Sequence, residues 1–194
     1  MYSIHNRNTR LALLTMVIAV PAAAAGPAHH YTLDPGSSAI AKVSFLGLSS
    51  KSAGFPKLTG RIVLDPARPQ SLDLDVLVDA RELTAGDGVT LARLKGANFF
   101  DVKNYPTIRY HGTAMTMTGA NTANVAGELT VRGVTKPSVL KVSFAIPPAK
   151  LSGREAVNII GTTTIDRRQF GMTAWQMVVG TKVTITLKAQ MIPG

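Results

Sequence analysis

The sequence predicts an all-β protein, an eight-stranded antiparallel barrel with one short helix in a loop. Three observations predict this fold: apolar and polar residues alternate along many segments, turn residues separate these segments, and only one segment has helical spacing. Sequential strands that each have one apolar face must close on themselves or stack as a sandwich, because an open sheet would expose an apolar face and two edges. We expect a barrel.

The start of the chain, residues 1–25, indicates a secretory signal peptide. Arg7 and Arg10 precede an uncharged apolar run that ends in small residues. A membrane-spanning helix is the alternative, but it needs about 20 apolar residues and this run is shorter. We therefore expect export to the periplasm, cleavage near residues 24–28, and one mature domain over residues 26–194.

The composition excludes several classes of protein. The chain has no cysteine, which rules out disulfides, thiolate catalysis and cysteine-ligated metal centres. Its 45% content of hydrophobic residues argues against disorder. The 21 Lys and Arg against 11 Asp and Glu give a net charge of +10, which becomes +8 when Arg7 and Arg10 leave with the signal peptide.

The expected strands have a period of two. In the clearest case Leu72, Leu74 and Val76 lie on one face, and Asp73 and Asp75 lie on the other. Such alternation is typical of half-buried antiparallel strands. The eight segments with this pattern are residues 39–50, 58–65, 71–79, 107–118, 124–131, 138–146, 156–165 and 182–191.

One helix is expected between the third and fourth strands, over residues 87–98. Asp87 can cap its first turn, and Leu91, Leu94 and Phe99 follow at helical spacing. The helix therefore lies in a loop of the barrel.

The interior of the barrel is either filled or hollow. An eight-stranded barrel is near the size at which side chains fill the interior or leave room for one small ligand. Small residues on the strands favour a cavity, but they also serve bends and corners of barrels, so a closed core remains the alternative. These small residues are Gly112, Ala114, Gly127, Gly161 and Ala189.

Five stretches carry a resemblance to a known family. They are YTLDPGSSAI (31–40), GFPKLTGRIVLD (54–65), LKGANFFDVKNYPTIRY (94–110), GELTVRGVTKPSVLKV (127–142) and TIDRRQFGM (164–172). Through these stretches the chain resembles the YceI family from residue 31 to residue 194. The resemblance implies a lipocalin-like barrel in the periplasm that binds polyisoprenoids.

The chain departs from the family where relatives carry histidine. Phe45 stands where many members have a histidine ahead of a glycine, and Ala92-Arg93 stands within the helix where D-x-H-L is usual. Tyr31 replaces a typical Trp. Any polar or metal-binding role of those histidines cannot be carried over, and what the resemblance implies is an apolar tunnel.

We expect this tunnel to hold a long apolar isoprenoid lipid of the quinone or polyprenol type, with no metal and no other cofactor. Each candidate for the lining is otherwise an ordinary core residue, and Trp175 would line the mouth or plug a barrel end. Candidates for contact with a polar head group are Tyr105, Arg109 and Arg167. The lining candidates are Phe45, Leu72, Leu74, Val76, Phe100, Ile108, Leu129, Phe144, Trp175 and Ile185.

The alternative function is an enzyme that acts on a lipid, amide or ester at the barrel mouth, where Tyr105, Arg109 and Arg167 would carry the chemistry. No serine stands at the spacing of a nucleophile elbow, so a catalytic triad is not expected. Asp73, Asp75 and Asp79 alternate on one face, which a solvated strand explains better than a metal site.

The positive charge leaves two interpretations of the surface. Lysines on outward strand positions favour contact with an anionic membrane, or they keep the protein soluble and protect strand edges. Nucleic acid is not an expected partner, because the bases form no stripe and no aromatic stacking platform accompanies them. The sequence does not predict the oligomeric state.

Overall fold

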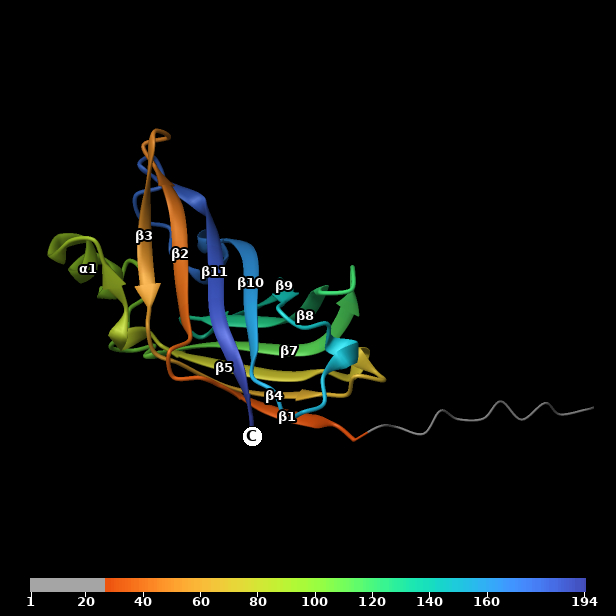
Figure 1. Ribbon diagram of the computed structural model, residues 1–194. Helices are drawn as coiled ribbons and strands as arrows, with labels where there is room; N and C mark the ends of the chain where they lie inside the picture. The colour runs from red at the N-terminus through yellow and green to blue at the C-terminus, as the bar shows by residue number, and fades with distance from the viewer. Residues whose placement is uncertain (1–26) are drawn as a thin grey trace, which may run out of the picture.

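The computed structural model describes residues 27–194, which form a closed antiparallel barrel with one short helix (Figure 1). The predicted barrel is confirmed, whereas the predicted signal peptide lies outside the described residues. The order of the barrel strands is β1-β4-β5-β7-β8-β9-β10-β11, and β11 pairs with β1 to close it. The strands are β1 (His29–Leu33), β4 (Leu58–Leu64), β5 (Asp73–Asp79), β7 (Thr107–Met117), β8 (Thr122–Val131), β9 (Val134–Phe144), β10 (Val157–Asp166) and β11 (Val179–Pro193).

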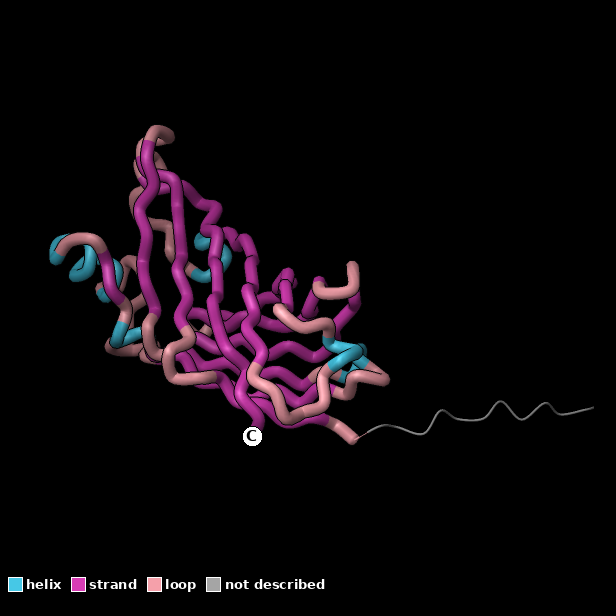
Figure 2. The backbone as a smooth tube through the Cα atoms, in the orientation of Figure 1, coloured by secondary structure: helices cyan, strands magenta, loops and turns pink. Residues whose placement is uncertain are grey.

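Three further strands extend the sheet from β11. β2 (Ser38–Phe45) pairs with β11, β3 (Ser49–Phe55) pairs with β2, and the two-residue β6 (Thr84–Ala85) pairs with β3. β11 has 15 residues, so its first part can pair with β2 and its last part with β1. Figures 1 and 2 show β2, β3, β10 and β11 running steeply across β4, β5 and β7.

The predicted single strand over residues 39–50 is wrong, because the chain reverses within it. β2 and β3 form a hairpin whose turn is Leu46 to Leu48. Leu46 and Gly47 have φ angles of 53° and 69° in the left-handed region. Gly47 favours such a turn, and Leu46 directly after Phe45 breaks the alternation, so a local signal of the reversal was present although the strand prediction ran through it.

The short helix is confirmed as α1 (Gly88–Lys95), and its cap is the predicted one. The Asp87 carboxylate accepts a hydrogen bond from the Thr90 backbone N–H at 2.8 Å. The helix ends at Gly96, earlier than the predicted Asn98. Four short 3₁₀ segments lie in other loops: η1 (Pro69–Ser71), η2 (Ala80–Glu82), η3 (Pro148–Lys150) and η4 (Arg167–Phe170).

Three of the five small residues considered for a cavity or for bends, Gly112, Gly127 and Gly161, serve close strand packing. Gly112 and Gly127 face each other across β7 and β8, next to an irregularity of register. A Cβ at Gly127 would overlap the His111 carbonyl oxygen and lie 2.7 Å from the Gly112 Cα. A Cβ at Gly161 would touch Leu140. These glycines let strands and side chains approach closely where the wall bends.

Candidate ligand-binding cavity

An apolar cavity of about 200 Å³ lies between the two crossing groups of strands. β2 and β3 supply a patch of small side chains, Ala39, Ala41 and Ala53, and Ala41 pairs with Ala53. The opposite wall comes from β5, β7, β8, β9 and α1. Its apolar members are Val76, Val78, Leu94, Phe99, Phe100, Ile108, Leu129, Val131 and Leu140.

The alternation of each strand explains why this wall is apolar. On β5 and β8, every second residue faces the interior, and Val76 and Leu129 are buried there. The alanines on β2 follow the same rule, but their side chains are too short to fill the space between the layers. The cavity is therefore made by small residues on β2 and β3 that face large ones on the other layer.

Two hydrogen-bonding side chains in the wall are of special interest, Tyr110 and Arg167. The Tyr110 hydroxyl donates a hydrogen bond to the Val125 carbonyl oxygen at 2.8 Å. Tyr110 is 9% exposed, and burial raises its pKa to about 12. The hydroxyl is thus neutral and engaged with the backbone of β8, leaving the ring to face the cavity.

Arg167 is a buried cation in this apolar wall, with only 3% of its surface exposed. It follows β10 in η4 and donates hydrogen bonds to the backbone carbonyl oxygens of Val179 and Gly180, at 2.9 Å each, and to that of Met172. Burial lowers the pKa of its guanidinium. Within residues 27–194 no carboxylate oxygen lies within 4.0 Å of it, so its charge is balanced by carbonyl dipoles.

Asp166 and Arg168, the two neighbours of Arg167 in sequence, do not line the cavity. Asp166 and Arg168 form an ion pair with 2.6 Å between Oδ2 and Nη2, and a hydrogen bond from Arg168 lowers the pKa of Asp166 to about 2. Asp166 and Arg168 make the salt bridge, and Arg167 alone reaches the cavity.

The structure brings about half of the predicted site residues together. The residues Val76, Phe100, Ile108, Leu129, Ile185 and Arg167 lie in the cavity wall. Leu72, Leu74 and Phe144 are buried in other parts of the core. Their roles in binding stay predictions.

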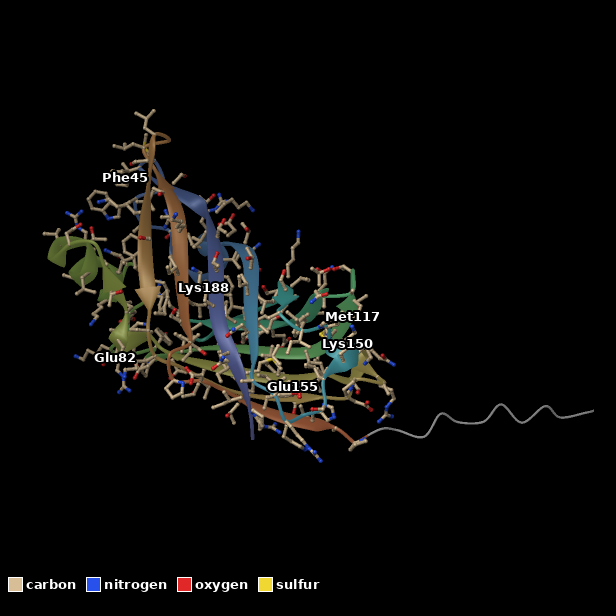
Figure 3. All side chains as sticks on the ribbon, viewed as in Figure 1. Phe45, Glu82, Met117, Lys150, Glu155 and Lys188 are labelled. Atoms are coloured by element: carbon tan, nitrogen blue, oxygen red, sulfur yellow. The ribbon has the colours of Figure 1, made fainter. Side chains whose placement is uncertain are left out.

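The remaining candidates lie away from the cavity. Phe45 lies at the end of β2 with Lys51 Nζ 5.4 Å from its ring centroid (Figure 3). Trp175 is 52% exposed, and Tyr105 is 39% exposed. Arg109 lies on the outer face of β7, where its Nε donates to Asp75 at 2.6 Å.

Sequence reasoning missed most of the wall on β2, β3 and β11. The alternation of Ala39, Ala41 and Val43 indicates that these residues face inward, but alanine was not considered as a lining residue. Phe99 was expected to complete a helix, yet it follows α1 and turns into the cavity.

The acidic residues considered for a metal site are held by arginines. Asp73 pairs with Arg61 at 2.9 Å, and Asp79 pairs with Arg81 at 2.7 Å. Among residues 27–194 no three His, Asp or Glu side chains gather closely enough to hold a metal ion. The part of the chain that the structure describes also contains no helix with the length and apolarity to span a membrane.

Replacing Tyr110 with Phe is expected to change the dependence of stability on pH. The unfolded chain ionises Tyr110 near pH 10, whereas the folded protein holds the proton until about pH 12, so the free energy of unfolding falls as pH rises between these values. At pH 11 this loss amounts to about 1.4 kcal/mol, and the Phe variant lacks it. At pH 7 the variant is less stable by about 1 kcal/mol, because it lacks the hydrogen bond to Val125.

Urea unfolding at pH 7, 9 and 11 measures both effects. Tyr31, whose pKa burial also raises, is present in both proteins and cancels in the comparison. Equal losses of stability between pH 9 and 11 in the two proteins would show that Tyr110 ionises alike in the folded and unfolded states.

A closed antiparallel barrel with an apolar cavity is typical of β-barrels that have room for a small apolar ligand. The family model of the YceI-like domain matches residues 31–191. The chain therefore belongs to the YceI family. A UPF0312 protein of Pseudomonas savastanoi pv. phaseolicola is 31% identical over 165 residues, which cover 84% of this chain and 86% of the relative.

Solved structures share the fold at lower identity. BcnA of Burkholderia cenocepacia superposes with a TM-score of 0.73 at 21% identity, over 81% of this chain and 98% of the other. A polyisoprenoid binding domain from Saccharophagus degradans, implicated in plant cell wall breakdown, superposes with a TM-score of 0.64 at 15% identity, over 84% of this chain and 98% of the other.

Proposed function

We propose that the protein is a periplasmic carrier for a long apolar isoprenoid lipid, of the quinone or polyprenol type, and that the lipid tail occupies the barrel cavity. The apolar cavity is the observation that carries this proposal. The polyisoprenoid binding domain with the same fold supports the class of ligand. Removal of the signal peptide, residues 1–25, by cleavage near residues 24–28 would release the mature domain.

The energetics favour a hydrocarbon ligand. Each methylene group that leaves water contributes about 0.8 kcal/mol, although ordering of a flexible tail offsets part of this gain. A cavity of about 200 Å³ exceeds the engineered protein cavity of about 150 Å³ that binds benzene. It accommodates only part of a long tail, so the tail must extend through an opening or displace side chains.

Arg167 suits the polar end of such a ligand. It is a buried donor group in an apolar wall, and a quinone carbonyl or a phosphate oxygen would accept hydrogen bonds from a guanidinium. The alternative function is an enzyme that acts on a lipid, amide or ester. Two of the residues expected to carry its chemistry, Tyr105 and Arg109, lie away from the cavity. Three of the five N–H groups of Arg167 donate to backbone carbonyl oxygens, which leaves two for a ligand.

Mass spectrometry of organic extracts tests the proposal. The mature protein, purified without detergent, should yield a reproducible isoprenoid or other long-chain lipid at close to one molecule per protein. Protein that has been stripped of lipid should rebind farnesol from solution. If no amphiphile is extracted and the stripped protein binds no apolar probe, the carrier function is wrong; if the bound lipid is converted to a product, the enzyme alternative is favoured.

A further inference from the structure

Exposed apolar side chains gather at one end of the molecule. Ten large hydrophobic residues among those described are strongly exposed, and five of them occupy three adjoining segments. We call these five the apolar rim: Leu46, Leu48, Val89, Trp175 and Met177. Most of the others, such as Ile40 and Ile160, stand singly on the outer faces of strands.

Contacts show that the segments of the apolar rim are neighbours. The Leu46 backbone N–H donates to the Val178 carbonyl oxygen at 2.8 Å, which joins the β2–β3 turn to the loop before β11. The Arg93 guanidinium of α1 lies 5.0 Å from the centroid of the Trp175 ring. Figure 1 shows the β2–β3 turn at the top with the start of β11 beside it.

The backbone holds two of these side chains at an energetic cost. Leu46 and Trp175 have φ angles of 53° and 59°, a region that bulky residues rarely adopt. About half of each side chain faces solvent, since Trp175 is 52% exposed and Leu46 is 59% exposed. Leu48 and Met177 are 95% and 98% exposed, so the interior of the protein uses neither of them. An external partner is the natural explanation for such an arrangement.

The apolar rim adjoins the cavity. Thr90, next to Val89, and Val179, two residues after Met177, both line the cavity wall. Lys51 of β3, three residues after Leu48, lines it as well. A ligand that leaves the cavity at this end would therefore emerge among the rim residues.

We propose that the apolar rim inserts into the surface of a phospholipid bilayer and that the lipid passes between bilayer and cavity at this end; the second part rests on the proposed function. Tryptophan suits the membrane interface, because its ring has an apolar body and a polar N–H. Leucine and methionine suit the boundary with the acyl chains. Arg93, beside the rim, suits anionic head groups, as does the net charge of +8 for residues 27–194.

Binding to vesicles of phosphatidylethanolamine and phosphatidylglycerol tests the insertion. Trp175 is the single tryptophan of the chain, so its emission reports on the rim directly. We expect a shift to shorter wavelength with vesicles and quenching by brominated acyl chains. The double variant Leu48→Ser/Met177→Ser should weaken partitioning at least tenfold. The matched control Ile40→Ser/Ile160→Ser, which removes two exposed residues of the strands, should change it less than twofold.

Three outcomes would overturn the insertion: an unchanged emission spectrum of the wild-type protein with vesicles, equal weakening by the two double variants, or a rim-dependent dimer with no binding to vesicles. The lipid-transfer step is tested separately. Leu48→Ser/Met177→Ser should still bind farnesol from solution yet take up lipid from vesicles at least tenfold more slowly. If the protein binds vesicles but binds no farnesol, the carrier function is refuted and the insertion stands.

Discussion

Replacing Ala41 with Phe should lower the affinity for a long apolar ligand about fiftyfold. Ala41 is buried in the cavity wall opposite the large side chains of β5 and β7. A benzyl side chain at this position would fill the space in which the proposed lipid tail would lie. Displacing about three methylene groups forfeits about 2.4 kcal/mol, which corresponds to that loss. Competition against a polyene fatty acid that fluoresces in apolar surroundings measures the affinity.

The adjacent residue offers the control. Ile40 faces outward on β2 and is 46% exposed, so Ile40→Phe adds an aromatic ring to the same strand without entering the cavity. Its affinity should stay within twofold of the wild-type value. Circular dichroism and urea unfolding check that Ala41→Phe is folded. If a folded Ala41→Phe variant binds as tightly as the wild-type protein, the ligand lies outside this cavity.

Replacing Gly127 with Ala is expected to lower the free energy of unfolding by about 3 kcal/mol, at the upper end of what overpacking costs. The new Cβ would collide with the backbone of His111 and Gly112 on β7. Backbone atoms cannot rotate away as a side-chain end does, so β7 and β8 would have to separate. Urea unfolding at neutral pH measures the change.

Gly86→Ala serves as the comparison. A Cβ at Gly86 would have no heavy atom within 4 Å, and its φ lies outside the left-handed region. We expect a change in the free energy of unfolding within about 0.5 kcal/mol. If Gly127→Ala is equally harmless, β7 and β8 do not depend on the close approach that facing glycines allow.

The sequence predicted the barrel, seven of its eight strands and the helix, because alternation and capping are local signals, but it missed β1, the strand that closes the barrel. Asp87 followed by apolar residues at helical spacing is sufficient to place the start of α1. The reversal at Leu46 and Gly47 was missed, because the apolar residues on both sides of the glycine have the composition of a continuous strand.

The cavity was harder to predict than the fold. Alternation separates inward from outward residues, as on β5, but it does not tell which inward residues meet a neighbour and which face empty space. Leu74 and Val76 have the same pattern, yet only Val76 reaches the cavity. That difference depends on how the two layers cross. The burial of Arg167 beside the exposed Arg168 likewise depends on the turn of η4.

The closure of the barrel has a consequence for how the protein folds. The seam joins the first described strand to the last, with Tyr31 opposite Pro193 and Leu33 opposite Met191. Contacts between residues so distant along the chain are expected to form late, because the chain loses the entropy of closing a long loop before these contacts stabilise it. We therefore expect the β1–β11 seam to be among the last features of the barrel to form.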